Sequence, residues 1–165
     1  MLEETGVPTR VDLSKTLPPE ERRKKGPYAV FECFQEIPCD PCYAACKQGA
    51  VQPFEDINDL PIVDQEKCNG CGICVASCPG LAVFVVDETF STDEALVKLP
   101  YEFVPLPSQG ETVTCHDREG REICQGRVLR VVKGKDNTAT PVVWVAFPKA
   151  FCHDVRHITL GRGAA

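Results

Sequence analysis

Short hydrophobic runs and polar turns give the first part of the chain an alternating order of strands and helices. Two apolar runs predict outer strands, and the stretch between them, dense in Cys, Pro and Gly, leaves room only for short helices and a central hairpin. The predicted elements are strands at residues 28–34 and 81–86, helices at residues 42–47 and 74–78, and hairpin arms at residues 51–54 and 61–64. Each half supplies one strand, one helix and one hairpin arm, so the pattern has an internal two-fold character.

The last third of the chain has a different pattern, rich in β-branched residues. Apolar runs at residues 111–115, 122–132 and 142–147 are separated by turn-forming residues at 118–120 and 134–137. This pattern predicts a small antiparallel β module of three or four strands.

A proline-rich connector lies between these two parts. Residues 88–110 contain Pro100, Pro105 and Pro107, which indicate a domain boundary after residue 99. Before the first of these prolines, residues 93–99 predict a brief helix.

Residues 1–27 precede the first strand as an N-terminal arm. They contain four prolines, a dense cluster of charges and few large apolar residues, so the arm cannot bury a core of its own. Two alternatives follow: a disordered tail, or an arm that becomes ordered against a partner. Pro19 predicts the start of one helical turn, with Glu20 and Glu21 suited to the positive end of its dipole.

Composition adds one unusual feature, which is 11 cysteines among 165 residues. Apolar residues at 43% and charged residues at 25% are ordinary for a globular protein, and no apolar run is long enough to span a membrane. The first residues are acidic where a secretory signal would be basic, which predicts a cytoplasmic protein without direct membrane insertion. Thiols stay reduced in the cytosol, so the cysteines indicate metal or redox chemistry and not disulfides.

Negative charge is concentrated in the middle of the chain. Residues 28–100 carry 12 acidic and 3 basic side chains, and the net charge of the whole chain is −6. No segment has the basic excess expected of a nucleic-acid footprint, which predicts no nucleic-acid partner.

One run carries the strongest chemical signal: four cysteines and a proline with the spacing C-x2-C-x2-C-x3-C-P, by which bacterial ferredoxins bind [4Fe–4S] clusters. The residues are Cys68, Cys71, Cys74, Cys78 and Pro79. Three cysteines two residues apart place thiolates at three corners of a cube, and Gly70 and Gly72 allow the backbone to approach it closely. The fourth cysteine lies one turn into the following helix, faces the other way and ligates a different cluster.

The fourth cysteine therefore requires a second cluster, and the first half of the chain supplies four more cysteines with the spacing C-x5-C-x2-C-x3-C. We predict two [4Fe–4S] clusters with crossed ligation. Cluster 1 is assigned to Cys33, Cys39, Cys42 and Cys78, and cluster 2 to Cys68, Cys71, Cys74 and Cys46. Zinc also binds C-x2-C pairs, but a third cysteine at this spacing and the trailing proline are not typical of zinc sites.

Residues 28–87 resemble a dicluster bacterial-type ferredoxin, which implies the pseudo-symmetric ferredoxin fold and one-electron transfer. The first half departs from the family pattern. Five residues separate its first two cysteines where two are usual, Pro41 replaces the glycine found at Gly70, and Lys47 replaces the proline after the last cysteine. These departures leave open a [3Fe–4S] centre or a shifted potential at cluster 1.

The wider chain is similar to a narrower family. The segment FECFQEIPCDPC at residues 31–42, between a proline-rich arm and a β module, resembles the small iron–sulfur subunits of FAD-containing dehydrogenases that oxidise proline, hydroxyproline and related amines. The resemblance implies a hetero-oligomer with FAD-containing dehydrogenase subunits and often a separate [2Fe–2S] subunit. The expected fold is α+β, with an extended N-terminal arm (1–27), a dicluster ferredoxin domain (28–99) and a small antiparallel β module (100–165).

Three cysteines remain in the predicted β module, near three histidines. They are Cys115, Cys124 and Cys152, with His116, His153 and His157. A two-residue turn at residues 119–120 would place Cys115 opposite Cys124. A zinc site is one alternative, and ordinary buried packing is the other, because these spacings match no standard zinc motif.

Together these features predict an electron-transfer subunit of an FAD-dependent amino-acid or amine dehydrogenase complex. It would relay single electrons between flavin centres or to an external acceptor, and the surrounding carboxylates favour low potentials. The sequence contains no nucleophile-and-base pattern, so we expect a subunit that is not itself catalytic. The alternatives are a stand-alone low-potential ferredoxin, and a structural or redox-sensing iron–sulfur module.

Overall fold

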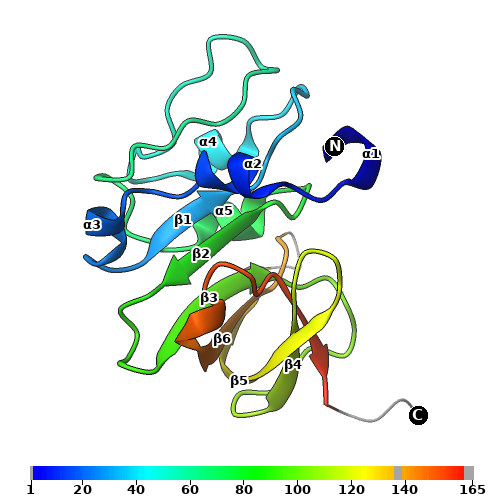
Figure 1. The fold of residues 1–165 in the computed structure, drawn as a ribbon. Coiled ribbons are helices and arrows are strands. Elements are labelled where there is room, and N and C mark those ends of the chain that lie inside the picture. Colours follow the sequence, from blue (N-terminus) through cyan, green and yellow to red (C-terminus); the bar gives the residue numbers. More distant parts are fainter. Residues whose placement is uncertain (1, 136–138, 162–165) are drawn as a thin grey trace.

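The computed structural model describes residues 2–135 and 139–161, and its centre is a seven-stranded antiparallel sheet (Figure 1). The strand order is β1-β2-β3-β6-β5-β4-β7. The strands are β1 (Tyr28–Phe31), β2 (Val83–Asp87), β3 (Glu94–Pro100), β4 (Thr112–His116), β5 (Glu122–Val132), β6 (Val142–Pro148) and β7 (His157–Leu160). The short helices are α1 (Leu2–Thr5), α2 (Arg10–Ser14), α3 (Glu20–Arg23), α4 (Pro41–Ala45), α5 (Ile73–Ser77) and the 3-10 turn η2 (Lys149–Phe151). This mixture of sheet and helix confirms the predicted α+β class.

The elements predicted around the cysteines are present within a few residues of their expected bounds. The outer strands β1 and β2 pair with each other, and α4 and α5 lie beside them in the upper half of Figure 1. The predicted central hairpin is reduced to one antiparallel bridge between Val51 and Val63, formed by two backbone hydrogen bonds between their neighbours. The long loops around this bridge therefore hold the cysteine segments together without a regular hairpin.

The helix predicted at residues 93–99 is wrong, because this segment forms β3. Its residues Glu, Ala, Leu and Lys favour helices intrinsically. Pairing with β2 on one side and β6 on the other overrides that preference, and the last six residues of the strand are buried. Because β3 ends at Pro100 and pairs with β6, one sheet spans the segments predicted as separate domains, whose boundaries stay a prediction.

The three strand runs predicted in the last third are confirmed as β4, β5 and β6, and β7 is the fourth strand of this part. Cys115 pairs with Cys124 as predicted, although the register shifts by a bulge between Cys115 and His116. The turn predicted at residues 134–137 lies partly outside the described residues, which omit 136–138.

Alternate residues of β1 and β2 belong to two different hydrophobic clusters, one on each face of the sheet. On β2, Phe84 and Val86 join the cluster shared with the C-terminal strands. Val83 and Val85 join a second cluster, against which five of the eight cysteines assigned to clusters pack. Burial on both faces explains why these strands have continuous apolar sequences.

The end of the N-terminal arm, around α3, packs against the rest of the chain. The helical turn predicted after Pro19 is present as α3, and it carries the buried Arg22. Arg23 forms an ion pair with Glu88 at 2.9 Å. The part of the arm around α3 therefore packs against the rest of the chain, while contact of the arm with a partner stays a prediction. Within the described ranges, no helix combines the length and apolar character needed to cross a membrane.

Candidate metal centres

The loop from Cys68 to α5 owes its shape to two glycines in left-handed backbone conformations. Gly70 has φ of +66° and Gly72, at the N-cap of α5, has φ of +88°. The side-chain oxygen of Asn69 accepts a hydrogen bond from the backbone N–H of Cys71 at 3.1 Å. These conformations turn three successive cysteines toward one side of the loop.

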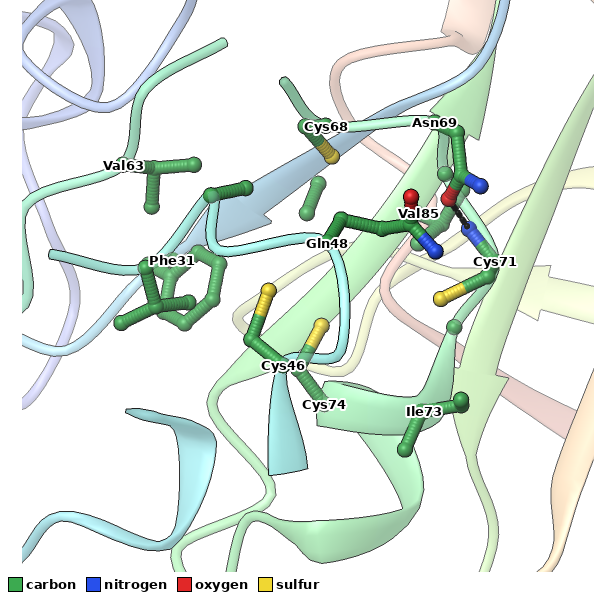
Figure 2. A pocket seen from close by; sticks show the side chains of 15 residues that line it. Phe31, Cys46, Gln48, Val63, Cys68, Asn69, Cys71, Ile73, Cys74 and Val85 are labelled. Carbon is green, nitrogen blue, oxygen red and sulfur yellow. Dashed lines mark hydrogen bonds between the residues drawn. The ribbon is translucent and has the colours of Figure 1, made fainter. Parts of the chain in front are cut away.

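One pocket is lined by Cys46, Cys68, Cys71 and Cys74. Figure 2 shows their four sulfur atoms pointing toward a common space, with Cys46 arriving from the end of α4. The walls are largely apolar and include Phe31, Val63 and Val85. We call this pocket the Cys68 site. It contains the four cysteines that the sequence assigns to cluster 2.

A second pocket is lined by Cys33, Cys39, Cys42 and Cys78. Cys33 follows the end of β1, and Cys78 is the C-cap of α5, where its sulfur accepts a hydrogen bond from the backbone N–H of Ala82 at 3.4 Å. We call this pocket the Cys33 site. The extended gap before Cys39 therefore does not keep the first-half cysteines apart, and the ligand sets stay a prediction.

Burial and backbone hydrogen bonds affect the thiols of both sites. Burial raises the pKa of Cys74 to about 12 and that of Cys42 to about 11. Burial also opposes ionisation of Cys46, but backbone N–H groups at residues 48–51 hydrogen-bond to its sulfur and hold its pKa below the usual value. In an assembled iron–sulfur centre the iron itself would stabilise the thiolates. The backbone N–H groups around Cys46 would then stabilise the negative charge of that centre.

The spacing of the sulfur atoms fits an iron–sulfur cluster better than a single zinc ion. Four sulfurs around one zinc lie about 3.8 Å apart, because each Zn–S bond is about 2.3 Å. Within residues 2–135 and 139–161, no three of the eight sulfurs lie within 4.8 Å of one another. This spacing is too wide for one zinc ion, and four thiolates at each pocket are the donor set that a [4Fe–4S] cluster requires.

The three remaining cysteines do not form one site. Cys115 faces Cys124 across the β4–β5 pair and is fully buried. Cys152 belongs instead to a group with Glu88 and His153. Nη1 of Arg23 lies 2.9 Å from the carboxylate of Glu88 and 3.2 Å from Nε2 of His153, so a guanidinium cation already fills the position that a metal ion would take. Burial raises the pKa of Cys152 to about 11, as expected of an inert packed thiol.

Sequence reasoning missed two buried cations that contact the Cys68 loop. Lys98 on β3 donates to the carbonyl oxygen of Gly70 at 2.6 Å, and Arg22 on α3 donates to that of Cys68 at 2.7 Å. The signal for Lys98 was a lysine inside an otherwise apolar run. Arg22 carries no such signal, because it lies in a cluster of exposed charges.

Replacing Gly70 with alanine is expected to damage the Cys68 site. A Cβ at this position would lie 2.5 Å from Cβ of Pro27 and 2.9 Å from its carbonyl carbon. The left-handed backbone alone costs about 1–3 kcal/mol for a residue other than glycine, and the contact with Pro27 adds to that cost. Anaerobic reconstitution followed by iron analysis should show iron loss.

The control for this variant is Gly110→Ala. Gly110 has φ of +85°, but an added Cβ would meet nothing within 4 Å. Equal iron content in the two variants would show that the contact with Pro27 is not what fixes the loop.

Comparison with known proteins agrees with this chemistry. The family described as "4Fe-4S binding domain" matches residues 61–84, which include the whole C-x2-C-x2-C-x3-C-P run. Pyruvate synthase subunit PorD of Methanocaldococcus jannaschii is 40% identical over 71 residues, covering 41% of this chain and 80% of that protein.

Two other relatives are similar over smaller shares of their length. A subunit of the tetrathionate reductase of Salmonella typhimurium is 27% identical over 128 residues, covering 68% of this chain and 50% of that protein. A subunit of an ion-translocating oxidoreductase complex of Methanosarcina acetivorans is 43% identical over 47 residues, covering 28% of this chain and 17% of that protein. No solved structure matches the chain significantly. The matched domain and the extent of the first relative show that this chain belongs to the family of [4Fe–4S] ferredoxin-type proteins.

Proposed function

We propose that the chain is an electron-transfer subunit of an oxidoreductase complex and carries two [4Fe–4S] clusters. The observation that carries this proposal is the grouping of eight cysteines around two neighbouring pockets, four to each. Each set combines three cysteines from one half of the module with one from the other, and this grouping supports the crossed ligation that we propose by analogy with dicluster ferredoxins. Such clusters supply one-electron storage at each site.

The protein residues hold the two sites close together and shield them unequally from water. The short helices α4 and α5 pack against each other and contribute cysteines to both pockets. Seven of the eight cysteines are partly buried, while Cys71 is exposed. The Cys68 site therefore has one ligand at the surface, where a redox partner can approach.

A complex with other subunits is supported by the names of the relatives. The three proteins compared above are all named as subunits of larger enzymes. Within this class we propose FAD-containing amino-acid or amine dehydrogenase subunits as partners, with a [2Fe–2S] subunit in the same assembly and a cytoplasmic location. This narrower proposal rests on the sequence resemblance of residues 31–42 and of the flanking segments.

Anaerobic purification with the partner subunits tests the proposal. We expect about eight iron and eight sulfide per chain, as two [4Fe–4S] clusters require. We also expect a stable complex that contains FAD, in which substrate reduces the clusters. Isolation of a cluster-loaded chain that binds no flavoprotein would favour a stand-alone ferredoxin. Clusters that resist reversible reduction would favour a structural or sensing module.

A further inference from the structure

Two buried cations lie against the Cys68 loop without a carboxylate partner. Only 8% of Lys98 and 7% of Arg22 is exposed. Across the described ranges, no carboxylate oxygen lies within 4.0 Å of a side-chain nitrogen of either residue. The carboxylate of Asp87 acts on Lys98 only from a longer distance, and the cation of Arg130 opposes it. A buried charge without a close counter-charge is costly, and a negatively charged group bound at the Cys68 loop would offset that cost.

Lys98 is held in place on three sides. Its Nζ donates to the carbonyl oxygen of Gly70 at 2.6 Å and lies 4.1 Å from the ring centroid of Trp144, its cross-strand neighbour on β6. A Cβ added to Gly72 would lie only 3.3 Å from Cδ of Lys98, so the glycine leaves room for the aliphatic part of the lysine side chain. The ammonium group is therefore fixed beside the backbone that carries Cys71.

Arg22 approaches the same loop from the N-terminal arm. Its guanidinium donates to four backbone carbonyl oxygens, of which that of Cys68 is at 2.7 Å. All four acceptors are neutral, so the positive charge is not cancelled by its own hydrogen bonds. The Cys68 loop thus has a fixed cation on a carbonyl of its first cysteine and another on the carbonyl of Gly70.

The Cys33 site has no comparable pair among the described residues. Burial has the largest effect in raising the pKa of Cys39, and the charges of Cys78 and Asp40 act in the same direction. Two arginines contact Glu32, the residue before Cys33, but both pair with its carboxylate. One of them, Arg156, stacks over Phe84, which belongs to the hydrophobic cluster on the other face of the sheet.

We propose that Lys98 and Arg22 are positioning charges that raise the reduction potential of the Cys68 site above that of the Cys33 site. Uptake of one electron adds one negative charge to a site, and a nearby fixed cation in a poorly hydrated environment stabilises that charge. No bond is formed or broken in this step, and the electron comes from the reductant. The inference rests on the proposed function, since it needs clusters at both sites, and it places the first electron at the Cys68 site.

Lys98→Met is the direct test, because methionine keeps an apolar stem over Trp144 and removes the charge. Anaerobic redox titration with dithionite, followed by electron paramagnetic resonance, gives a midpoint potential for the signal of the reduced cluster at each site. The midpoint of the signal from the Cys68 site, here called the Cys68 signal, should shift to lower potential. The midpoint of the Cys33 signal should stay in place. Midpoints that do not move, or that move together by the same amount, would overturn the proposal.

Lys67→Met is the matched control. Lys67 precedes Cys68 and the substitution changes the net charge equally, but the side chain is 56% exposed and lies 3.4 Å from Asp64. Solvent screens such a charge, so both midpoints should stay at their wild-type values. A shift as large as that of Lys98→Met would assign the effect to net charge and overturn the role of burial.

Two further variants and the order of reduction in the unaltered chain test the proposal if Lys98→Met does not assemble. Lys98→Arg keeps the charge and should keep the wild-type midpoint, and Arg22→Gln should lower the same midpoint as Lys98→Met. In the unaltered chain the Cys68 signal should appear first as the potential is lowered, and the reverse order would refute the proposal. An iron count showing one cluster would instead refute the two-cluster function, a separate outcome.

Discussion

Replacing Cys78 with alanine is expected to remove or degrade the cluster at the Cys33 site and to leave the Cys68 site loaded. Cys78 follows Cys74 closely in the sequence, but the two side chains line different pockets. Cys74 lines the Cys68 site, and Cys78, the C-cap of α5, lines the Cys33 site with Cys33 and Cys39. The loss of one thiolate removes a quarter of the ligands of a [4Fe–4S] cluster. Iron content after anaerobic reconstitution should therefore fall by roughly half if that whole cluster is lost.

The complementary variant makes this prediction sharper. Cys46→Ala should damage the Cys68 site, because Cys46 lines that pocket from the end of α4. The two variants should then retain different signals in electron paramagnetic resonance. If both retain the same signal, or if Cys78→Ala loses the signal of the site formed by its sequence neighbours, the crossed assignment is wrong. Cys124→Ala, at a cysteine outside both pockets, should leave both signals intact.

The cysteine-bearing part was predictable because its structure is specified locally. Cysteines with two or three residues between them, with glycine before α5 and proline after Cys78, leave the backbone few conformations. The helices α4 and α5 are accordingly found within two residues of their predicted starts. The facing of Cys115 and Cys124 was predictable for a similar reason, since a short turn fixes which residues of a hairpin are opposite each other.

The parts that sequence missed depend on contacts distant along the chain. The segment of β3 has helix-favouring residues, and only its neighbours β2 and β6 make it a strand. Strand β7 (HITL) has no continuous apolar run of the kind that marks β1, and it is defined by pairing with β4. Arg22 appears in sequence as one charge in a solvated cluster. Its role follows from carbonyl groups up to 46 residues away, which no local pattern reveals.

Replacing Glu32 with glutamine is expected to destabilise the fold strongly. The carboxylate of Glu32 accepts hydrogen bonds from Arg118 at 2.6 and 2.8 Å and from Arg156 at 2.8 Å. The side chains are 8%, 13% and 4% exposed, respectively, so this is a buried network. It joins the end of β1 to the β4–β5 turn and to the segment before β7.

Glutamine keeps the shape of the side chain but leaves two buried arginines without a counter-charge. Removing one partner of a buried ion pair costs about 3–5 kcal/mol, and urea unfolding of the cluster-loaded protein at neutral pH should show a loss of this size. Glu36→Gln is the control, since Glu36 is exposed and the same change there should have little effect. Equal losses in the two variants would contradict the role of the network.

The pH dependence of this loss gives a second check on the same network. Burial alone would raise the pKa of Glu32, but the hydrogen bond from Arg118 and the charges of both arginines hold this pKa below its ordinary value of 4.5. A carboxylate whose pKa is lower in the folded state stabilises the fold at pH values above its unfolded pKa, and that contribution is lost as pH falls through the folded pKa. The difference in unfolding free energy between the unaltered chain and Glu32→Gln should therefore have its largest value at neutral pH and should decrease below about pH 4.5. A difference that stays constant over this range would mean that the glutamine acts through packing and not through the charge of Glu32.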